Sequence, residues 1–538
     1  MAFEYRVKGQ TVKLPISRKL VAVRFMDPSG PAERRAAIDP KAEVGSFDDR
    51  YEVPNEKLTI VPVAQHDPPN DGGVAAAVGA LNADPAIERV TPVFDLGSRQ
   101  VVAPNRILVG FKPQTTNNAI EIINDYGGEI IETMEEGNEY VVQLPPTADP
   151  FDVINDITKH AEVDYAEPDF VTIGSHVARA GLKTASGNSE AGGGDNKINT
   201  PLPGEGLDAG PAAPGNDPFL QFQYAARITQ AIQAWQSMSG SAAIRIAILD
   251  EGVDTTHPDL RNAIVANFDA VDGELIQQPR RWDSHGTACA GLAAATPNNN
   301  VGVRGIGGGC SLMPVRIAFS ENPNANWTWV EANVVRGIDW AWKNGADVLS
   351  NSWVGGAPSN AIMNALERAR RFGRGGRGCV IVIAAGNDSG PVAFPANLPN
   401  VLAISASNEF DQPKTKTSAD GETWWGSNFG PEVDLAAPGV HNFTTDIVGQ
   451  DGSNPGGAVD ADYVNNFNGT SSATPIVAGV AGLVLSVNPN LTEAQVRRLL
   501  TLTADKVGQV VYTNGRNNQM GQGRVNALRA VQAAPTFV

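Results

Sequence analysis

The sequence predicts an α/β protein in which a doubly wound, mostly parallel sheet follows one or two small ferredoxin-like α+β modules. Three observations carry this prediction. Short β-branched runs alternate with helical segments after residue 217, a β-α-β-β-α-β order precedes residue 174, and a stretch rich in Gly, Pro, Asn and Ser separates the two parts. The expected divisions are modules at 1–100 and 101–173, a flexible linker at 174–216 and the large domain at 217–538.

The large domain contains five continuous apolar runs that are typical of buried strands. Such runs suit strands covered on both faces of a parallel sheet, because no polar residue alternates along them. Helical segments lie between or after the runs, and functional groups should lie beyond the carboxyl ends of the strands. The strands are expected at 244–250, 313–318, 347–353, 379–387 and 401–407, and the helices at 287–295, 329–343, 360–373 and 491–504.

The N-terminal part contains a weak internal repeat. Its second half has strands and helices in the order β-α-β-β-α-β, and its first half contains a similar but fainter series. We interpret the two halves as tandem copies of one small module, with a single irregular domain as the alternative. The second copy comprises 107–111, 118–128, 139–145, 150–160 and 163–170, and the first comprises 20–25, 57–63, 73–85 and 87–94.

Composition excludes some classes of function. The 538 residues include 41 basic and 59 acidic side chains, a formal net charge of −18, so no basic excess is present to neutralise nucleic-acid phosphates. No run reaches the ~18 apolar residues that span a membrane, and the N-terminus has no secretory h-region. We expect a cytoplasmic monomer without nucleic-acid or membrane partners; a secreted protein is the alternative if a signal was trimmed.

The three cysteines, Cys289, Cys310 and Cys379, are too few for a disulfide framework. One bridge with one free thiol is possible, and three reduced, buried thiols are the favoured interpretation.

Three polar residues stand at the strand and helix ends where a site is expected. Asp250 closes the first apolar run, His285 opens a helix of small residues, and Ser471 opens another. Taken singly, each has an ordinary structural role as a turn, helix-start or capping residue. Taken together in this order they form a possible Asp-His-Ser triad. The helix N-terminus at Ser471 also favours a developing oxyanion, which suits a nucleophile at that position. Asn387 ends another strand and has an amide that can donate to that oxyanion.

Four motifs then give a specific resemblance to subtilisin-like serine proteases, the subtilase family. The resemblance covers about 217–530 and implies that Asp250 orients the imidazole, His285 acts as general base and Ser471 as nucleophile. It implies further that Asn387 and the backbone N–H of Ser471 bind the oxyanion. The motifs are DEGVD (250–254) with HPDL (257–260), HGTACAG (285–291), AAGN (384–387) and NGTSSATP (468–475).

The resemblance also implies a substrate pocket for the side chain before the scissile bond. Asp388 at its rim and Glu251 beside the triad aspartate resemble acidic positions that favour basic substrates, a kexin-like feature. The acids that line the kexin primary pocket are not evident in the sequence, so a broad or apolar preference is the alternative. The implied pocket walls are Ser352, Trp353 and Val354 on one side and Ala384, Ala385 and Gly386 on the other.

A structural Ca²⁺ ion is the implied cofactor. Asp259 and Asn299 resemble side-chain ligands, and Val301 and Val303 resemble main-chain carbonyl ligands of the family's tight site. Ca²⁺ takes six to eight oxygen ligands at flexible distances, which such a loop can supply. An Asn/Gly turn without an ion is the alternative.

The segment from 105 to 171 resembles a subtilase propeptide, which implies an intramolecular inhibitor that is cut off in or near 171–216. The expected function is therefore a serine endopeptidase acting on proteins and peptides and made as an autoprocessed zymogen. A catalytically silent binding or regulatory protein with a protease fold is the alternative. A nucleotide-binding protein is disfavoured, because GIGGGC (305–310) lacks the last glycine of the phosphate-binding loop.

Overall fold

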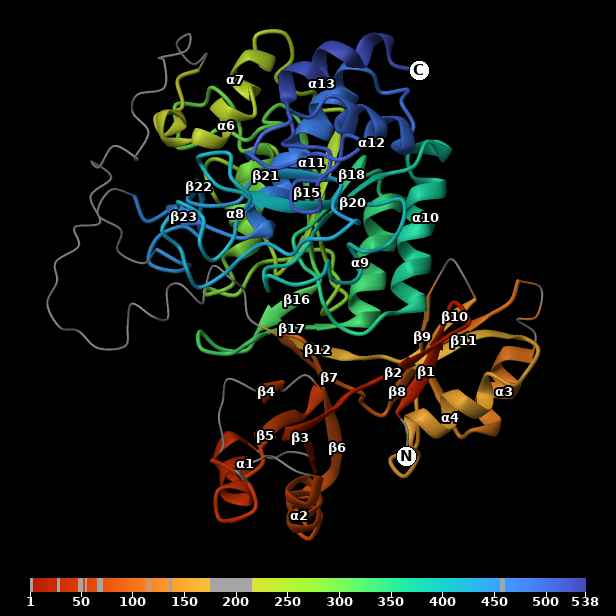
Figure 1. The fold of residues 1–538 in the computed structure, drawn as a ribbon. Helices are drawn as coiled ribbons and strands as arrows, with labels where there is room; N and C mark the ends of the chain where they lie inside the picture. Colours follow the sequence, from red (N-terminus) through yellow and green to blue (C-terminus); the bar gives the residue numbers. More distant parts are fainter. Residues whose placement is uncertain are drawn as a thin grey trace, which may run out of the picture. The chain divides into compact units, whose positions relative to one another are not determined.

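The protein is represented by a computed structural model that describes residues 3–26, 30–46, 52–53, 56–64, 71–113, 115, 118–134, 138–174, 215–454 and 460–538 (Figure 1). The chain divides into two compact units. The N-terminal unit comprises Met1–Ser175, Ser320–Arg336 and Gly355–Asn364, and the C-terminal unit comprises His176–Phe319, Gly337–Val354 and Ala365–Val538. These units differ from the expected division at 173/217, because two short segments of the later sequence join the N-terminal unit. The expected linker and its processing site lie almost wholly outside the described residues.

The C-terminal unit is built on a seven-stranded sheet in the order β14-β15-β13-β18-β19-β20-β21. Every neighbouring pair in it runs parallel, so the predicted doubly wound parallel sheet is confirmed. The strands are β13 (Arg245–Asp250), β14 (Phe268–Asp269), β15 (Ser311–Arg316), β18 (Val348–Asn351), β19 (Val380–Ala384), β20 (Leu402–Ser407) and β21 (Leu435–Pro438). A separate hairpin pairs β22 (Asn442–Thr445) with β23 (Tyr463–Phe467).

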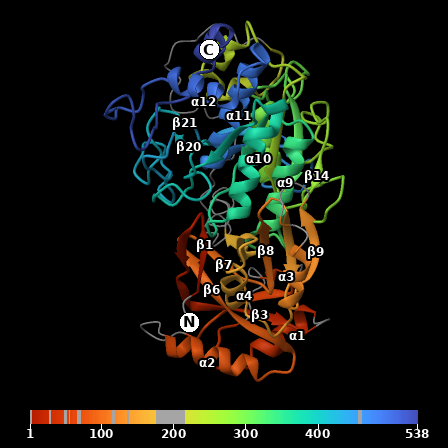
Figure 2. The ribbon, with the colours of Figure 1, turned by 90° about the vertical axis from the view of Figure 1, so that its right-hand side faces the viewer.

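Helices flank this sheet, and α9 and α10 lie side by side in both ribbon views (Figures 1 and 2). Arg368 of α10 and Asp339 of α9 form a buried ion pair at 2.7 Å. The helices are α6 (Tyr224–Ile228), α7 (Ala231–Ala234), α8 (His285–Ala294), α9 (Glu331–Lys343), α10 (Asn360–Gly376), α11 (Thr470–Val487), α12 (Glu493–Leu502) and α13 (Ala527–Ala533), with 3₁₀ turns at Leu220–Phe222 and Ala534–Thr536. A capping box formed by Thr492 and Gln495 begins α12.

Helix α11 is the central helix of the C-terminal unit. Its 18 residues are long and apolar enough to cross a membrane, so the expectation that no stretch reaches this length was wrong. Almost all of the helix is buried against the sheet and α8, which explains its apolar composition. Among the described residues it is the single helix of this kind, and its apolar surface is protein core.

The second N-terminal module has the predicted ferredoxin-like topology. Its elements follow the order β-α-β-β-α-β, and its antiparallel sheet has the strand order β11-β8-β10-β9. Numbered within the module, that order is fourth, first, third, second. The elements are β8 (Arg106–Phe111), α3 (Ala119–Asp125), β9 (Glu129–Met134), β10 (Glu139–Gln143), α4 (Pro150–Ile157) and β11 (Val163–Pro168).

The first module has the same element order and the same strand order, β6-β3-β5-β4. The tandem-copy interpretation therefore agrees with the fold better than a single irregular domain. Its sheet continues through four more short strands in the order β6-β7-β12-β17-β16, and a β1-β2 hairpin precedes it. The elements are β1 (Glu4–Val7), β2 (Gln10–Lys13), β3 (Ile16–Phe25), α1 (Pro31–Ile38), β4 (Glu52–Val53), β5 (Leu58–Pro62), α2 (Asp71–Asn82), β6 (Ile87–Leu96), β7 (Arg99–Val102), β12 (Val171–Gly174), β16 (Ala318–Ser320) and β17 (Trp327–Val330).

One predicted helix begins later than expected. The sequence predicts a helix over 329–343, whereas α9 begins at Glu331 and Trp327–Val330 forms β17. The sequence WTWV alternates aromatic with β-branched residues, which favours a strand when a partner strand is present. That partner is β12, which pairs antiparallel with β17.

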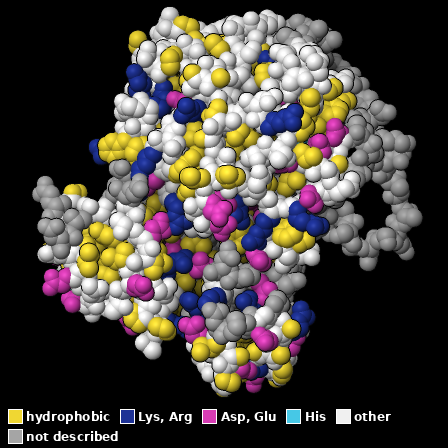
Figure 3. Space-filling model, turned by 180° about the vertical axis from the view of Figure 1, so that it is seen from behind, with side chains coloured by type: hydrophobic (Ala, Val, Ile, Leu, Met, Phe, Trp, Pro, Cys, Tyr) yellow, Lys and Arg dark blue, Asp and Glu magenta, His cyan; other side chains and the backbone are white. Residues whose placement is uncertain are grey.

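The described surface carries mixed charge. On the face in Figure 3, acidic and basic side chains are interspersed.

Candidate active site

The end of β13 and the start of α8 bring Asp250 and His285 together. Nδ1 of His285 lies 2.9 and 3.0 Å from the two carboxylate oxygens of Asp250, and both residues are buried. The backbone N–H of Glu251 donates to the same carboxylate at 2.8 Å. Burial lowers the pKa of His285, but the adjacent Asp250 carboxylate outweighs it and raises that pKa well above its ordinary value. The pair can therefore stabilise an imidazolium.

A glycine allows α8 to begin this close to β13. A Cβ on Gly286 would lie 2.1 Å from the carbonyl oxygen of Gly252, so no other residue fits there without a backbone shift. The carboxylate of Glu251, fully buried beside it, accepts the backbone N–H of His285 at 2.8 Å. This hydrogen bond holds the side chain of Glu251 at the start of α8, which gives Glu251 a positioning role. The hydrogen bond does not support a direct contact between Glu251 and substrate.

Ser471 lies in the first turn of α11, at 7% exposure. Its Oγ donates to the carbonyl oxygen of Ser352 at 3.0 Å, and Ser352 Oγ donates to the carbonyl oxygen of Ser471 at 2.9 Å. First-turn N–H groups have no intrahelical acceptor, and the helix dipole adds positive potential at this end. The surroundings of Ser471 therefore suit a negatively charged oxygen.

Thr470 orients the side chain of Asn387, which follows β19. The backbone N–H and the Oγ1 hydroxyl of Thr470 both donate to Asn387 Oδ1, at 2.8 and 3.0 Å. With its oxygen held in this way, Asn387 keeps its Nδ2 group as the donor for another ligand. Sequence reasoning did not single out Thr470, although it lies within the NGTS motif.

The two predicted pocket walls face each other. A Cβ on Gly386 would lie 3.4 Å from Val354 Cγ2, so the side chain of Val354, after β18, lies against the backbone of Gly386, after β19. All six predicted wall residues are buried, with Trp353 at 2% exposure. Asp388 is exposed, as a residue at the rim of a pocket must be.

A second cluster of polar groups forms around Asp259. Its carboxylate accepts N–H groups from Asn299 Nδ2 at 2.7 Å and from the backbone of Val303 at 2.8 Å. Asp217, which sequence reasoning missed, accepts the backbone N–H of Asn299 at 3.1 Å. Burial, with the nearby charge of Asp217, raises the pKa of Asp259 to about 7.

The donor set of this cluster fits a hard cation. It brings two buried carboxylates and an amide side chain to one loop, and a divalent cation would offset the cost of burying both negative charges. Asn299 Oδ1 accepts the N–H of Val301 at 2.8 Å, which closes the loop on itself. Asp217 carried no sequence signal, because it stands at the edge of the Gly- and Pro-rich segment far from HPDL.

Two further side chains border the Asp250–His285 pair. The ring of Phe467 meets the imidazole edge to face, with centroids 5.3 Å apart. The buried thiol of Cys289 lies 3.9 Å from His285 Nδ1 and donates to the carbonyl oxygen of Ser471 at 3.5 Å. All three cysteines are free and buried, which confirms the interpretation as thiols.

A histidine between two carboxylates supports the segment that leads to Ser471. His441 places Nδ1 3.2 Å from Glu409 and Nε2 3.3 Å from Glu422, so both ring nitrogens face negative charge. Its backbone N–H donates to Asn468 Oδ1 at 2.7 Å, and Asn468 Nδ2 donates to Glu422 at 2.8 Å. Burial opposes the charge, but the hydrogen bonds to Glu409 and Glu422 outweigh it and raise the pKa of His441 to about 9.

Replacing His441 with glutamine should lower stability in a pH-dependent way. The pKa of His441 is about 9 in the folded protein, against an ordinary value of 6.5. Its contribution to the free energy of unfolding is therefore complete below pH 6.5 and is lost as the pH rises through 9. Allowing for the partial exposure of His441, we expect this contribution to be about 2 kcal/mol. Thermal melting of the inactive Ser471→Ala chain, with and without His441→Gln, should show a clear gap at pH 6 that closes near pH 10. Glu432→Gln, at an exposed carboxylate, is the control; an equal gap at both pH values would contradict the prediction.

Comparison with known proteins gives two family matches. Residues 241–523, more than half of the chain, match the Subtilase family, and residues 96–169 match the Fervidolysin N-terminal prodomain. Both matches agree with the motifs and confirm the resemblance.

Three similar proteins illustrate the extent of the likeness. Thermitase of Thermoactinomyces vulgaris is 35% identical over 319 residues, which cover 59% of this chain and 99% of thermitase. The calcium-dependent protease of Trichormus variabilis is 36% identical over 330 residues, which cover 56% of this chain and 48% of the relative, so the chain spans about half of its length. The structure of fervidolysin from Fervidobacterium pennivorans aligns with a TM-score of 0.59 and 23% identity over 82% of this chain and 61% of fervidolysin, which shows a shared fold.

Proposed function

Because this chain belongs to the subtilase family, we propose that it is a serine endopeptidase that uses Asp250, His285 and Ser471 as its catalytic triad. The observation that carries the proposal is the buried Asp250–His285 pair at 2.9 Å beside the helix N-terminus that holds Ser471. These groups come from three separate segments of the chain, and each has the chemistry that its role requires.

In the proposed reaction, Ser471 Oγ attacks the scissile carbonyl carbon while its proton passes to His285 Nε2. The Asp250 carboxylate accepts a hydrogen bond from His285 Nδ1–H, which keeps Nε2 free to act as the base and then stabilises the imidazolium. The amine leaves with the proton from His285, and a water molecule repeats the sequence to release the acyl group. Asn387 Nδ2 and the backbone N–H of Ser471 donate to the oxyanion in both steps.

A mechanism-based label tests the proposal directly. A fluorophosphonate reagent should add once to the purified chain, and peptide mass mapping should find the adduct on Ser471. Ser472→Ala is the matched control, because Ser472 is the neighbouring hydroxyl in α11 and accepts a hydrogen bond from Asn442. Its label should equal that of the wild type. Absence of any adduct on Ser471 would favour the catalytically silent alternative.

Calcium at the Asp259 cluster forms a second part of the proposal. Asp259, Asn299 and Asp217 would hold the ion through side chains, and Val301 and Val303 through carbonyl oxygens. The ion would supply positive charge to a buried acidic loop and has no part in the chemistry at Ser471. Support comes from the two buried carboxylates and from a relative named a calcium-dependent protease.

Removal of calcium should therefore destabilise the protein. At a concentration about 1,000-fold above its dissociation constant, the ion adds about 4 kcal/mol, and we expect EDTA to lower Tm by about 10 °C. Calorimetry of the Ser471→Ala chain avoids self-digestion during the scan. Asp259→Asn should abolish the response to EDTA, whereas Asp451→Asn, at an exposed carboxylate, should retain it. An unchanged Tm in EDTA would refute the site.

The second N-terminal module, 101–173, is the proposed intramolecular inhibitor of a zymogen. The fervidolysin prodomain match supports this role, as do contacts from the second module to the starts of two helices. Glu167 accepts the backbone N–H groups of Asn360 and Ala361 at 2.8 and 2.9 Å, and so caps α10. Asp169 accepts the N–H of Ala332 at 2.9 Å in the first turn of α9. Cleavage within 171–216 would then release the enzyme.

A further inference from the structure

The first N-terminal module has no function among the roles derived so far. Of its residues 3–102, only the last seven fall within a family match. It nevertheless shares its sheet with β12, the strand that ends the second module and begins the expected cleavage segment. The question is what a second copy of the module contributes at that position.

Strand β12 is paired on both of its edges. On one side Val171 and Thr172 pair with Val330 and Trp329 of β17, and on the other side Thr172 pairs with Val101 of β7. An extended peptide that adds to one sheet edge gains main-chain hydrogen bonds but must first lose its own conformational freedom. Here β7 orders β12 beforehand, so its pairing with β17 costs less entropy than the pairing of a free tail.

Arg99 joins β7 to the same region through its side chain. A Cβ on Gly174 would lie 2.3 Å from Arg99 Cδ, and a Cβ on Gly355 would lie 2.7 Å from Arg99 Cγ. The arginine stem therefore lies against the end of β12 and against the segment that directly follows the predicted pocket wall in the sequence. Thr172 makes the equivalent approach to Gly356, where a Cβ would lie 2.9 Å from Thr172 Oγ1.

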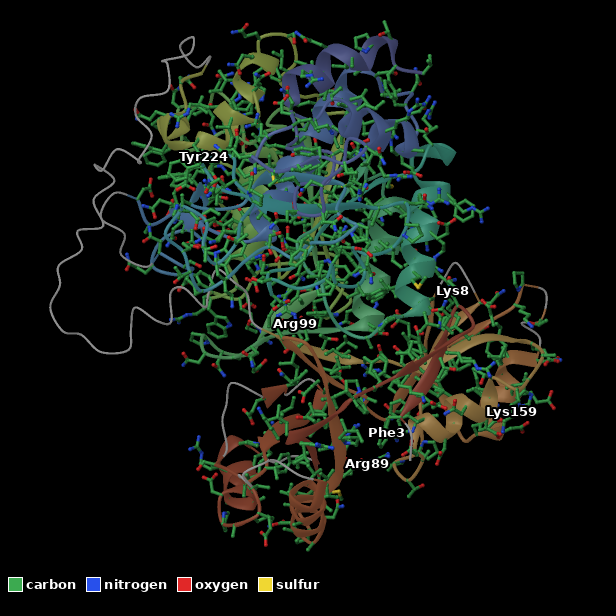
Figure 4. The ribbon with its side chains drawn as sticks, viewed as in Figure 1. Phe3, Lys8, Arg89, Arg99, Lys159 and Tyr224 are labelled. Carbon is green, nitrogen blue, oxygen red and sulfur yellow. The ribbon has the colours of Figure 1, made fainter. Side chains whose placement is uncertain are left out.

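The two modules are also joined to each other. The ring of Phe3 packs on Phe94 of the first module and on Phe151 of the second, with centroids 5.4 and 5.2 Å apart (Figure 4). Arg89 on β6 donates to the carbonyl oxygen of Ala148 at 2.7 Å, just before α4. A displacement of the first module is therefore transmitted to the second.

The β1-β2 hairpin adds a contact of its own. The backbone N–H of Lys8 donates to Asn360 Oδ1 at 3.0 Å, and Asn360 Nδ2 donates to the carbonyl oxygen of Arg6 at 2.8 Å. Asn360 is the first residue of α10, which Glu167 of the second module caps. Both N-terminal segments thus hold the same helix start.

We propose that residues 3–102 form an accessory inhibitory module, which holds β12 against β17 and slows release of the inhibitor. The proposal rests on the zymogen function above and extends it, because a propeptide with one module would hold the same strand on one edge only. Release then requires loss of the β12–β17 pairing from a strand that β7 keeps ordered.

The test compares activation of full-length variants. After transfer of the purified zymogen to activating conditions, the lag before peptidase activity is measured together with loss of the full-length band. Arg99→Ala and Arg89→Ala should each shorten the lag about fivefold, the factor expected for a loss of about 1 kcal/mol. Lys159→Ala is the control, because Lys159 forms an exposed pair with Asp156 on the second module (Figure 4). Lags equal to that of Lys159→Ala would overturn the proposal.

Glu167→Ala separates this proposal from the one on which it rests. If Glu167→Ala shortens the lag and both arginine variants do not, the second module inhibits and the accessory role of the first is wrong. If no variant or wild-type sample gains activity, the zymogen function itself fails.

A second measurement needs no activity. Hydrogen exchange of residues 171–174 in the Ser471→Ala chain should become faster with Arg99→Ala, while exchange in β8 stays unchanged. Unchanged exchange in β12 would contradict the proposal, and faster exchange in β8 as well would reveal general unfolding of the unit and contradict a specific hold on β12.

Discussion

Replacing Ser471 with alanine should lower kcat about 10⁶-fold and leave the chain at full length. The loss follows from removing the nucleophile, because the remaining oxyanion donors and substrate contacts supply only the residual rate; the magnitude is the one measured for the serine of subtilisin. Cleavage between the N-terminal part and the rest should stop for the same reason if the chain processes itself. Peptide hydrolysis rates and intact masses after storage of both purified proteins provide the measurement.

Ser472→Ala is again the matched control, because it changes the next residue of α11 and leaves Ser471 intact. That variant should retain activity within a few-fold and should be processed like the wild type. A Ser471→Ala chain that is still cut at the wild-type site in a pure preparation would show that another protease performs the processing. A Ser471→Ala chain with wild-type turnover would remove the triad assignment altogether.

Replacing Asp250 with asparagine should lower kcat about 10⁴-fold with little change in KM. An asparagine keeps the size of the side chain, but its amide cannot hold the Nδ1 proton as the carboxylate does, and the imidazole then adopts the wrong tautomer. The effect acts on the proton transfer rather than on substrate binding, so it should appear in kcat. Steady-state kinetics over a range of pH give both constants, with the loss smallest at alkaline pH.

Asp254→Asn is the control for this variant. Asp254 is also buried and lies four residues further along, where its carboxylate accepts N–H groups from Thr256 and Val448. Its replacement should lower stability and leave kcat within a few-fold of the wild type. Equal losses of kcat from Asp250→Asn and Asp254→Asn would indicate a general disturbance of the β13–α8 region instead of a catalytic role for Asp250.

The sequence predicted the parallel sheet well because its strands are buried on both faces. The run 380–384, VIVIA, contains no polar residue, and its β-branched residues favour a strand that is covered on both faces. The Asp250, His285 and Ser471 positions were predictable for a related reason. Each stands at the end of a strand or the start of a helix, and strand ends of a parallel sheet converge on one edge.

Contacts between distant segments were not predictable from local pattern. Trp327–Val330 forms a strand because β12, more than 150 residues earlier, pairs with it, and no periodicity within WTWV identifies that partner. Asp217 approaches the 298–303 loop for reasons of tertiary packing, and its sequence neighbours resemble a linker. The hydrogen bond from the backbone of His285 to the buried carboxylate of Glu251 was likewise not predictable from local pattern.

The repeated strand order of the two modules also bears on the ancestry of the chain. In each copy the fourth strand is followed by one short tail strand, β7 after β6 and β12 after β11. These tails occupy equivalent places in the repeat, and they pair with each other. Topology of this kind is what a duplication of one unit produces. On the proposed inhibitory role, a further unit extends the sheet beside β12 and changes no residue of the proposed triad.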